Sequence, residues 1–166
     1  MLFRIFSAFV VVCVMAVVGS TTAQAKVCYS KFETEAEQGL RIHSELMVIG
    51  LTCQKVKGGK DLYHKYKLFT AKHAPLIEEY ENSLISFYRR QGHAKPDKSL
   101  HKLRTDLGNK ISQHAAKLGA YSFCKQFSGR IDKALEMSRD TVRKWSQQSW
   151  PNQKTSYPAC YTASYN

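Results

Sequence analysis

Three histidines stand on apolar stripes of helical spacing and are the first candidates for chemistry in this chain. His43 lies between Gly39 and Gly50 on one such stripe, and His73 and His114 lie on two later ones. Imidazole nitrogens bind zinc and copper, and they bind haem iron without a covalent link to the chain. The three side chains therefore form a candidate metal or haem site, with zinc, copper or non-covalent haem as the cofactor.

The competing interpretation is that each of these histidines is a core residue whose ring nitrogens are hydrogen-bonded. Tyr66, Tyr80, serines and backbone groups are the available partners. We favour this interpretation because no carboxylate is expected on the same inward layer, and because no E-x-x-H motif of a di-iron bundle occurs. The other three histidines fall near helix ends or in a loop and are expected to face solvent: His64, His93 and His101.

Motifs of common enzymes are missing from the sequence. It contains no H-E-x-x-H, no G-x-S-x-G, no phosphate-binding loop and no dinucleotide glycine fingerprint. An acidic cluster at Glu78, Glu79 and Glu81 lacks any sign of the pocket that a general acid requires. The sequence thus favours a non-enzymatic protein with no cofactor, while an enzyme with a dispersed site stays open.

The first 25 residues have the pattern of a cleaved signal peptide. Arg4 precedes an apolar run over residues 5–18, and Ala23-Gln24-Ala25 provides the small residues that a signal peptidase reads. A membrane anchor is the alternative, but the run is shorter than the roughly 20 apolar residues that span a bilayer. We expect cleavage before Lys26, and a periplasmic or secreted protein without a transmembrane anchor.

The cysteines agree with export. Removal of the leader takes away Cys13 and leaves four cysteines, which in an exported chain predict two disulfides. No C-x-x-C occurs, which disfavours a zinc ribbon, a thioredoxin-like pair and covalent haem attachment. The four remaining cysteines are Cys28, Cys53, Cys124 and Cys160.

The hydrophobic periodicity predicts an all-α fold, an antiparallel up-down bundle of about four helices in one domain, residues 26–166. Ser30 and Glu33 form a capping box at the first helix start, and Pro75 predicts a break near residues 71–74 of the second. The expected helices cover about 31–57, 61–90, 97–127 and 130–149, followed by a non-helical tail over 150–166.

The turn between the last two helices has two candidates, Gly119 and Ser128-Gly129. We prefer Ser128-Gly129, because it gives the third helix a length similar to the first two. With this turn, the three inward histidines fall in one layer, within about 3 Å of each other along the bundle axis. A turn at Gly119 removes His114 from that layer.

The bundle geometry also predicts the disulfide pairing. Cys53 and Cys124 lie near helix ends at one pole, whereas Cys28 and Cys160 flank the bundle at the opposite pole. Bridged Cα atoms lie within about 7 Å, which helices some 40 Å long do not allow between poles. The predicted bridges are Cys28–Cys160 and Cys53–Cys124.

The net charge points to an anionic partner. The chain carries +12, and without the leader 24 basic residues face 13 acidic ones, a net charge of +11. The candidate partners are an anionic envelope polymer, a lipid headgroup or an acidic protein surface. Nucleic acid is disfavoured by export, and the alternative is that the lysines only solvate helix surfaces. The candidate anion-binding residues gather at the two poles: Lys55, Lys57, Lys60, Lys65, Lys67, Arg89 and Arg90.

Overall fold

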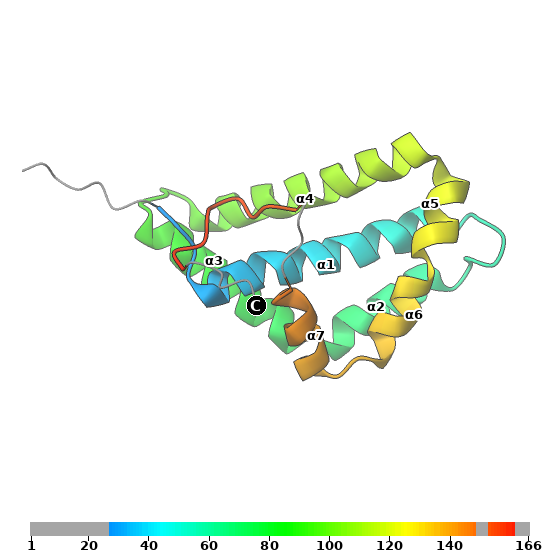
Figure 1. The fold of residues 1–166 in the computed structure, drawn as a ribbon, viewed down its shortest axis with the longest axis horizontal. Coiled ribbons are helices and arrows are strands. Elements are labelled where there is room, and N and C mark those ends of the chain that lie inside the picture. The colour runs from blue at the N-terminus through cyan, green and yellow to red at the C-terminus, as the bar shows by residue number, and fades with distance from the viewer. Residues whose placement is uncertain (1–26, 149–152, 162–166) are drawn as a thin grey trace, which may run out of the picture.

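The computed structural model describes residues 27–148 and 153–161, which form a bundle of helices (Figure 1). Within these ranges there is no regular strand, and one isolated bridge pairs Tyr29 with Ala159. The predicted all-α bundle with two disulfides is confirmed. The helices are α1 (Lys31–Cys53), α2 (Leu62–Lys72), α3 (Ala74–Arg90), α4 (Pro96–Leu118), α5 (Ala120–Phe127), α6 (Gly129–Glu136) and α7 (Arg139–Ser146).

Helix α1 is the central element of the bundle, because it contacts every other helix. It begins at the predicted capping box, in which Ser30 and Glu33 satisfy each other's backbone N–H groups. Leu40, Leu46 and Ile49 on this helix are at most 1% exposed. Burial of each such side chain contributes roughly 1.5–3 kcal/mol, so α1 organises the core.

Two glycines let neighbouring elements approach α1 closely. A Cβ on Gly39 would lie 2.2 Å from Cε2 of the Tyr80 ring of α3. A Cβ on Gly50 would lie 3.2 Å from the Tyr63 Cα of α2. The first position therefore accommodates an aromatic ring, and the second accommodates a helix backbone.

The predicted break in the second helix is confirmed. Helix α2 ends at Lys72, His73 is the junction, and Pro75 stands in the first turn of α3. Proline has no backbone N–H and is accommodated there without losing a helical hydrogen bond. The break turns one long sequence stripe into two separate helices against α1.

The first helix is shorter than predicted. It ends at Cys53 instead of residue 57, and a loop continues to Asp61. Gly58 has a φ of +85°, which a right-handed helix does not contain. Gly59 lies so close to the carbonyl oxygen of Cys53 that a Cβ would be 1.9 Å from it. The loop thus folds back on the helix end.

The predicted helices 97–127 and 130–149 are wrong as continuous units. Gly119, with a φ of +77°, separates α4 from α5, and Ser128 separates α5 from α6. Ser138 then begins α7 by accepting a hydrogen bond from the Thr141 backbone N–H. Helix α5 contacts α4 and α1, α6 contacts α2, and α7 contacts α1. Short helices therefore cross the end and one side of the bundle where two long ones were expected (Figure 1).

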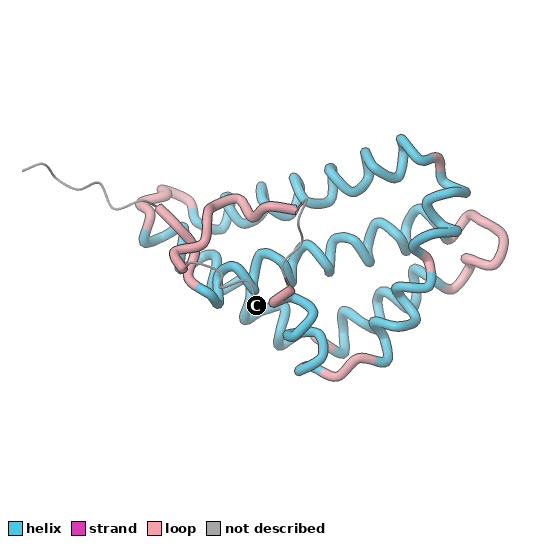
Figure 2. Tube along the Cα trace, viewed as in Figure 1, coloured by secondary structure: helices cyan, strands magenta, loops and turns pink. Residues whose placement is uncertain are grey.

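Both predicted disulfides are present. Cys53 at the end of α1 is bonded to Cys124 of α5 with a Cα–Cα distance of 5.5 Å. Cys28 is bonded to Cys160 at 5.0 Å, which ties the tail to the start of α1. Figure 2 places the α1–α2 loop at one end of the bundle and the α3–α4 loop at the other. The two disulfides therefore lie at opposite ends of the bundle, as predicted from the positions of the cysteines.

The tail over 153–161 is non-helical and packs beside the start of α1. The backbone N–H of Tyr29 donates to Pro158, and that of Cys160 donates to Tyr29, both at 2.8 Å. The Tyr157 ring packs edge-on against Tyr29 and Phe87. Among the described helices, none combines the length and hydropathy that a membrane span requires. The proposed leader lies outside the described residues.

Candidate functional site

His43 is a buried, hydrogen-bonded core residue in this structure. Its Nε2 lies 3.0 Å from Oγ1 of Thr70 and 3.2 Å from the hydroxyl of Tyr66, both on α2. Burial, reinforced by the charge of Arg104, lowers the pKa of His43 to about 4. The ring is therefore neutral at neutral pH, and its Nε2 is occupied by hydrogen-bonding partners.

The three-histidine layer predicted from the sequence is not formed. His73 is buried at the α2–α3 junction against Phe69, while His114 is exposed on α4 beside Phe123 and Phe127. In the part of the chain that the structure describes, no group of three His, Cys, Asp or Glu side chains is placed to hold a metal. The layer depended on a continuous third helix, which the turn at Gly119 interrupts.

The other histidines stand near helix ends and in a loop. His64 and His101 are exposed, as predicted. His93 is half-buried, because its ring packs against Tyr88 and its Nδ1 lies 2.8 Å from Oγ of Ser99. None of these three lies with His43 in a metal-binding group among the described residues.

Four glutamates of α1 form a feature that the sequence analysis missed. Each is partly or fully buried, and each binds a segment far away in the chain. Burial of a carboxylate is costly unless it is paired, so these contacts attach distant segments to the central helix. The pairs are Glu33 with Arg90, Glu35 with Arg143, Glu37 with Arg41 and the backbone N–H of Ser156, and Glu45 with Arg130.

Glu35 has the most complete set of partners. Arg143 donates to it from Nε at 2.7 Å, Gln147 at 2.7 Å and the Tyr80 hydroxyl at 3.0 Å. Burial opposes ionisation, but these hydrogen bonds hold the pKa of Glu35 below its ordinary value. The carboxylate thus joins α1, α3 and α7. The abundance of glutamate at the start of α1, in a basic chain, was the only signal of this arrangement.

Two glutamates of the acidic cluster on α3 form ion pairs with other helices. Glu79 is exposed and paired with Arg139, and Glu81 is paired with Arg104. Glu78 is exposed. Two of the three carboxylates therefore join helices at the surface.

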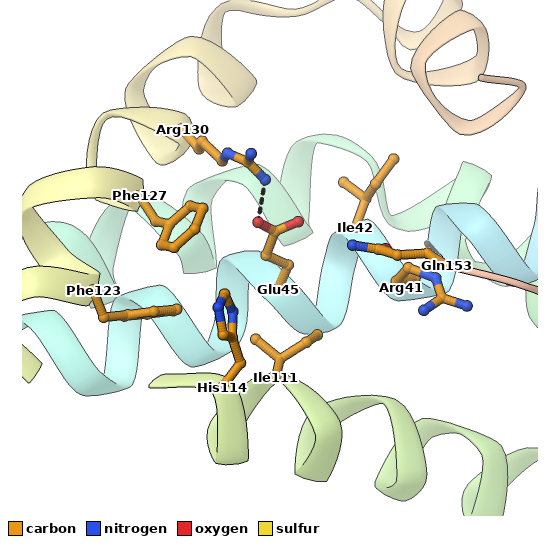
Figure 3. A pocket seen from close by; sticks show the side chains of 9 residues that line it. All are labelled: Arg41, Ile42, Glu45, Ile111, His114, Phe123, Phe127, Arg130 and Gln153. Atoms are coloured by element: carbon orange, nitrogen blue, oxygen red, sulfur yellow. Dashed lines mark hydrogen bonds and ion pairs between the residues drawn. The ribbon is translucent and has the colours of Figure 1, made fainter. Parts of the chain in front are cut away.

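A pocket centred on Glu45 lies between α1, α4, α5 and α6 (Figure 3). Its cavity volume is about 130 Å³. Arg130 donates to Glu45, and the Arg130 guanidinium lies 4.9 Å above the Phe127 ring. Burial raises the pKa of Glu45, although Arg130 opposes the shift. The lining residues are Arg41, Ile42, Glu45, Ile111, His114, Phe123, Phe127, Arg130 and Gln153.

Two of the predicted anion-binding residues form ion pairs within the protein, and the others do not. Lys65 is paired with Asp132 and Arg90 with Glu33, so these two serve the fold. Lys67 lies over the Tyr63 ring. The others are exposed and form no ion pair with any described residue: Lys55, Lys57, Lys60 and Arg89.

Lys55, Lys57 and Lys60, which are exposed and form no ion pair with a described residue, belong to the α1–α2 loop, next to a second cavity of about 260 Å³. We call this cavity the basic cleft. Lys57 and Lys125 line it, together with the Cys53–Cys124 disulfide. Its apolar wall consists of Val56, Leu62 and Tyr121, and Tyr121 is 71% exposed. The sequence analysis missed Lys125 because α5 was expected to be part of a longer helix.

Comparison of the chain with protein families, characterised proteins and solved structures finds no match. The chemistry of the two cavities must therefore be inferred from the residues that line them.

Proposed function

We propose that this protein is an exported, non-enzymatic binding protein that docks on an anionic lipid surface of the cell envelope. The docking site is the basic cleft with the α1–α2 loop, where Lys55, Lys57, Lys60 and Lys125 supply the positive charge. The signal-like leader and the two disulfides support a periplasmic or secreted location.

The proposal rests on one difference: the glutamates of α1 are paired within the bundle, whereas the lysines of the α1–α2 loop are not. The four glutamates of α1 are engaged by arginines or backbone groups inside the bundle. The lysines of the α1–α2 loop are exposed and form no ion pair with any described residue. Unneutralised positive charge at one end of a molecule attracts an anionic surface.

The apolar wall of the cleft favours lipid over the two other candidate partners, an envelope polymer and an acidic protein surface. Tyr121 is 71% exposed and lines the cleft together with Lys125. Leu118, which does not line the cleft, is 38% exposed at the end of α4, three residues before Tyr121. Aromatic and aliphatic side chains among lysines insert at the headgroup level, and each lysine near the surface contributes about 1 kcal/mol. A polymer of charged groups alone gains nothing from these apolar side chains.

Cosedimentation with lipid vesicles tests the proposal. The oxidised protein is mixed with vesicles of phosphatidylcholine alone or with phosphatidylglycerol, at low and high salt. We expect binding only to the anionic vesicles, with an affinity that falls as salt rises. The Lys57→Glu/Lys125→Glu variant should lose most of this binding. The Lys98→Glu/Lys110→Glu variant, with the same net charge at exposed sites on α4, should keep it.

Three outcomes contradict the proposal. One is equal loss in both charge variants, because the binding then depends only on net charge. Another is binding that does not respond to salt. The third is preference for a soluble polyanion or an acidic peptide over anionic vesicles, which would assign one of the other partner classes.

A further inference from the structure

The basic cleft is lined by positive groups without a carboxylate. Lys57 of the α1–α2 loop and Lys125 of α5 are exposed, and neither forms an ion pair with a described residue. No aspartate or glutamate is among the described residues that line the cleft. In the other pocket, by contrast, Arg130 is paired with Glu45 (Figure 3). The cleft therefore presents uncompensated positive charge to a ligand.

The Cys53–Cys124 disulfide joins the two elements that carry these lysines. Cys53 ends α1, four residues before Lys57, and Cys124 directly precedes Lys125. Both cysteines line the cleft and are at most 4% exposed. Because a covalent bond holds the loop to α5 at this point, the cleft is formed before any ligand binds, which lowers the entropic cost of binding.

Ser128 is a third polar residue that lines the cleft. It is half-buried at the start of α6, and its side chain does not cap that helix. The rim at Gly58 carries no side chain, and an added Cβ there would meet no atom within 4 Å. The cleft is therefore open to solvent on the Gly58 side, where a ligand can enter.

These polar residues favour a phosphate group over a carboxylate. Ammonium groups bind phosphate as point charges, whereas a planar carboxylate is matched best by the forked guanidinium group of arginine. No arginine is among the described residues that line the cleft. A tetrahedral phosphate has enough oxygens to accept hydrogen bonds from Lys57, Lys125 and Ser128 at the same time.

The volume and the apolar wall of the cleft indicate what is attached to the phosphate. Since a cavity of roughly 150 Å³ holds one benzene ring, the cleft of about 260 Å³ holds about ten non-hydrogen atoms. A phosphate with one glycerol unit has this size. Val56, Leu62 and Tyr121 offer apolar contacts to the glycerol carbons and to the first carbons of an acyl chain. A whole lipid does not fit, so its acyl chains must stay outside the cleft.

We propose that the cleft takes up the phosphate group of one glycerophospholipid, with the glycerol unit attached to it, while the acyl chains stay in the membrane. Lys57, Lys125 and Ser128 donate to the phosphate oxygens, and Tyr121 packs against the first acyl carbons. This inference rests on the docking proposed above. It adds a defined site, because docking by charge alone is diffuse, whereas head-group uptake is saturable at one lipid per protein.

Calorimetric titration of the oxidised full-length protein with three soluble probes tests the assignment. The probes are monomeric dihexanoylphosphatidylglycerol, glycerol 3-phosphate, which lacks acyl chains, and hexanoate, which lacks the phosphate. We expect one molecule of the lipid to bind per protein. Each other probe should bind about tenfold more weakly or worse, since it loses buried methylene groups or hydrogen bonds to a charged group. Equal binding of glycerol 3-phosphate would assign the cleft to soluble phosphate esters, and equal binding of hexanoate would exclude phosphate recognition; either result overturns the proposal.

The Lys125→Gln variant assigns the contact to its residue. It should weaken binding of the soluble lipid about tenfold, because it removes one charged donor from the cleft. The matched control is Lys133→Gln, which removes the same charge from an exposed site on α6 outside the cleft and should leave the affinity unchanged. Equal loss of affinity in the two variants contradicts a defined site.

Vesicle cosedimentation separates failure of this inference from failure of the docking. Binding to phosphatidylglycerol vesicles, without binding of the soluble lipid at millimolar concentration, overturns head-group uptake and leaves the docking intact. Absence of vesicle binding overturns the docking, and with it this inference. Saturable binding of the soluble lipid together with vesicle binding supports both.

Discussion

The hydroxyl of Tyr66 lies 3.2 Å from Nε2 of His43, with the two rings packed 5.4 Å apart. This contact joins α1 to α2 in the region where Gly50 lets the α2 backbone approach. Histidine stands on an apolar stripe here because it links two closely packed helices by hydrogen bonds. Among the described residues, no group of three potential metal ligands includes His43.

Replacement of His43 should therefore destabilise the protein. His43→Ala removes a side chain that is 5% exposed and leaves Thr70 and Tyr66 without their partner. We expect a loss of about 2–4 kcal/mol in the free energy of unfolding, measured by urea denaturation. His101→Ala, at an exposed site, is the control and should change stability by less than about 0.5 kcal/mol. Equal stability of both variants would refute this role.

Stability should also fall between pH 6.5 and pH 5 because of His43. Its folded-state pKa of about 4 is below the ordinary 6.5, so the unfolded chain binds the proton more readily. The contribution is present above pH 6.5 and is lost as pH falls toward 4. The expected loss between pH 6.5 and 5 is about 2 kcal/mol.

The His43→Gln variant isolates this pH effect, because glutamine keeps a polar group without a titrating proton. Its free energy of unfolding should depend less on pH over the same range. Glu35, whose pKa is lowered, loses its contribution only at lower pH and does not obscure the comparison. Identical pH profiles of wild type and His43→Gln would show that His43 is not the titrating group.

Gly39→Ala and Gly108→Ala should have opposite effects, although both glycines are inside helices. At Gly39 the added methyl group collides with the Tyr80 ring and displaces its hydroxyl from Glu35, which should cost about 1–3 kcal/mol. At Gly108 the nearest atom is 3.8 Å away, and alanine should stabilise the helix by about 0.5–1 kcal/mol. Thermal unfolding of the two variants measures the difference, and a shift in the same direction would contradict the packing described.

Replacement of a buried glutamate by glutamine should destabilise the protein more than the same replacement at an exposed glutamate. Glu35→Gln breaks a buried set of hydrogen bonds from Arg143, Gln147 and Tyr80, with an expected loss of about 2–3 kcal/mol. Glu79→Gln removes an exposed ion pair with Arg139 and should cost less than about 1 kcal/mol. Urea denaturation compares them. If Glu35→Gln is as stable as Glu79→Gln, the buried carboxylate does not hold the bundle together.

Local signals in the sequence were sufficient to predict the all-α fold, the start of α1 and both disulfides. The Ser30–Glu33 capping box and the break next to Pro75 each depend on residues within one or two turns. The Cys53–Cys124 bridge was predicted correctly because both cysteines lie at the same end for either choice of turn.

Features that depend on distant partners were not predictable in this way. Buried Glu35 is paired with Arg143, which lies 108 residues later in the chain. The region after Gly119 folds into short helices, and no stripe in the sequence showed that each would pack on a different neighbour. The apolar stripe predicted that His114 faces inward, but His114 is exposed on α4. Its place in a histidine layer depended on an unbroken third helix, which Gly119 interrupts.

The central claim, that the basic cleft and its loop dock on anionic lipid, is tested most directly by amide hydrogen exchange of the wild-type protein with and without phosphatidylglycerol vesicles. The account predicts slower exchange in residues 54–61 and in α5 when the vesicles are present, with little change at the α3–α4 loop. Slowed exchange at the α3–α4 loop near Arg89, with none in residues 54–61, would contradict it.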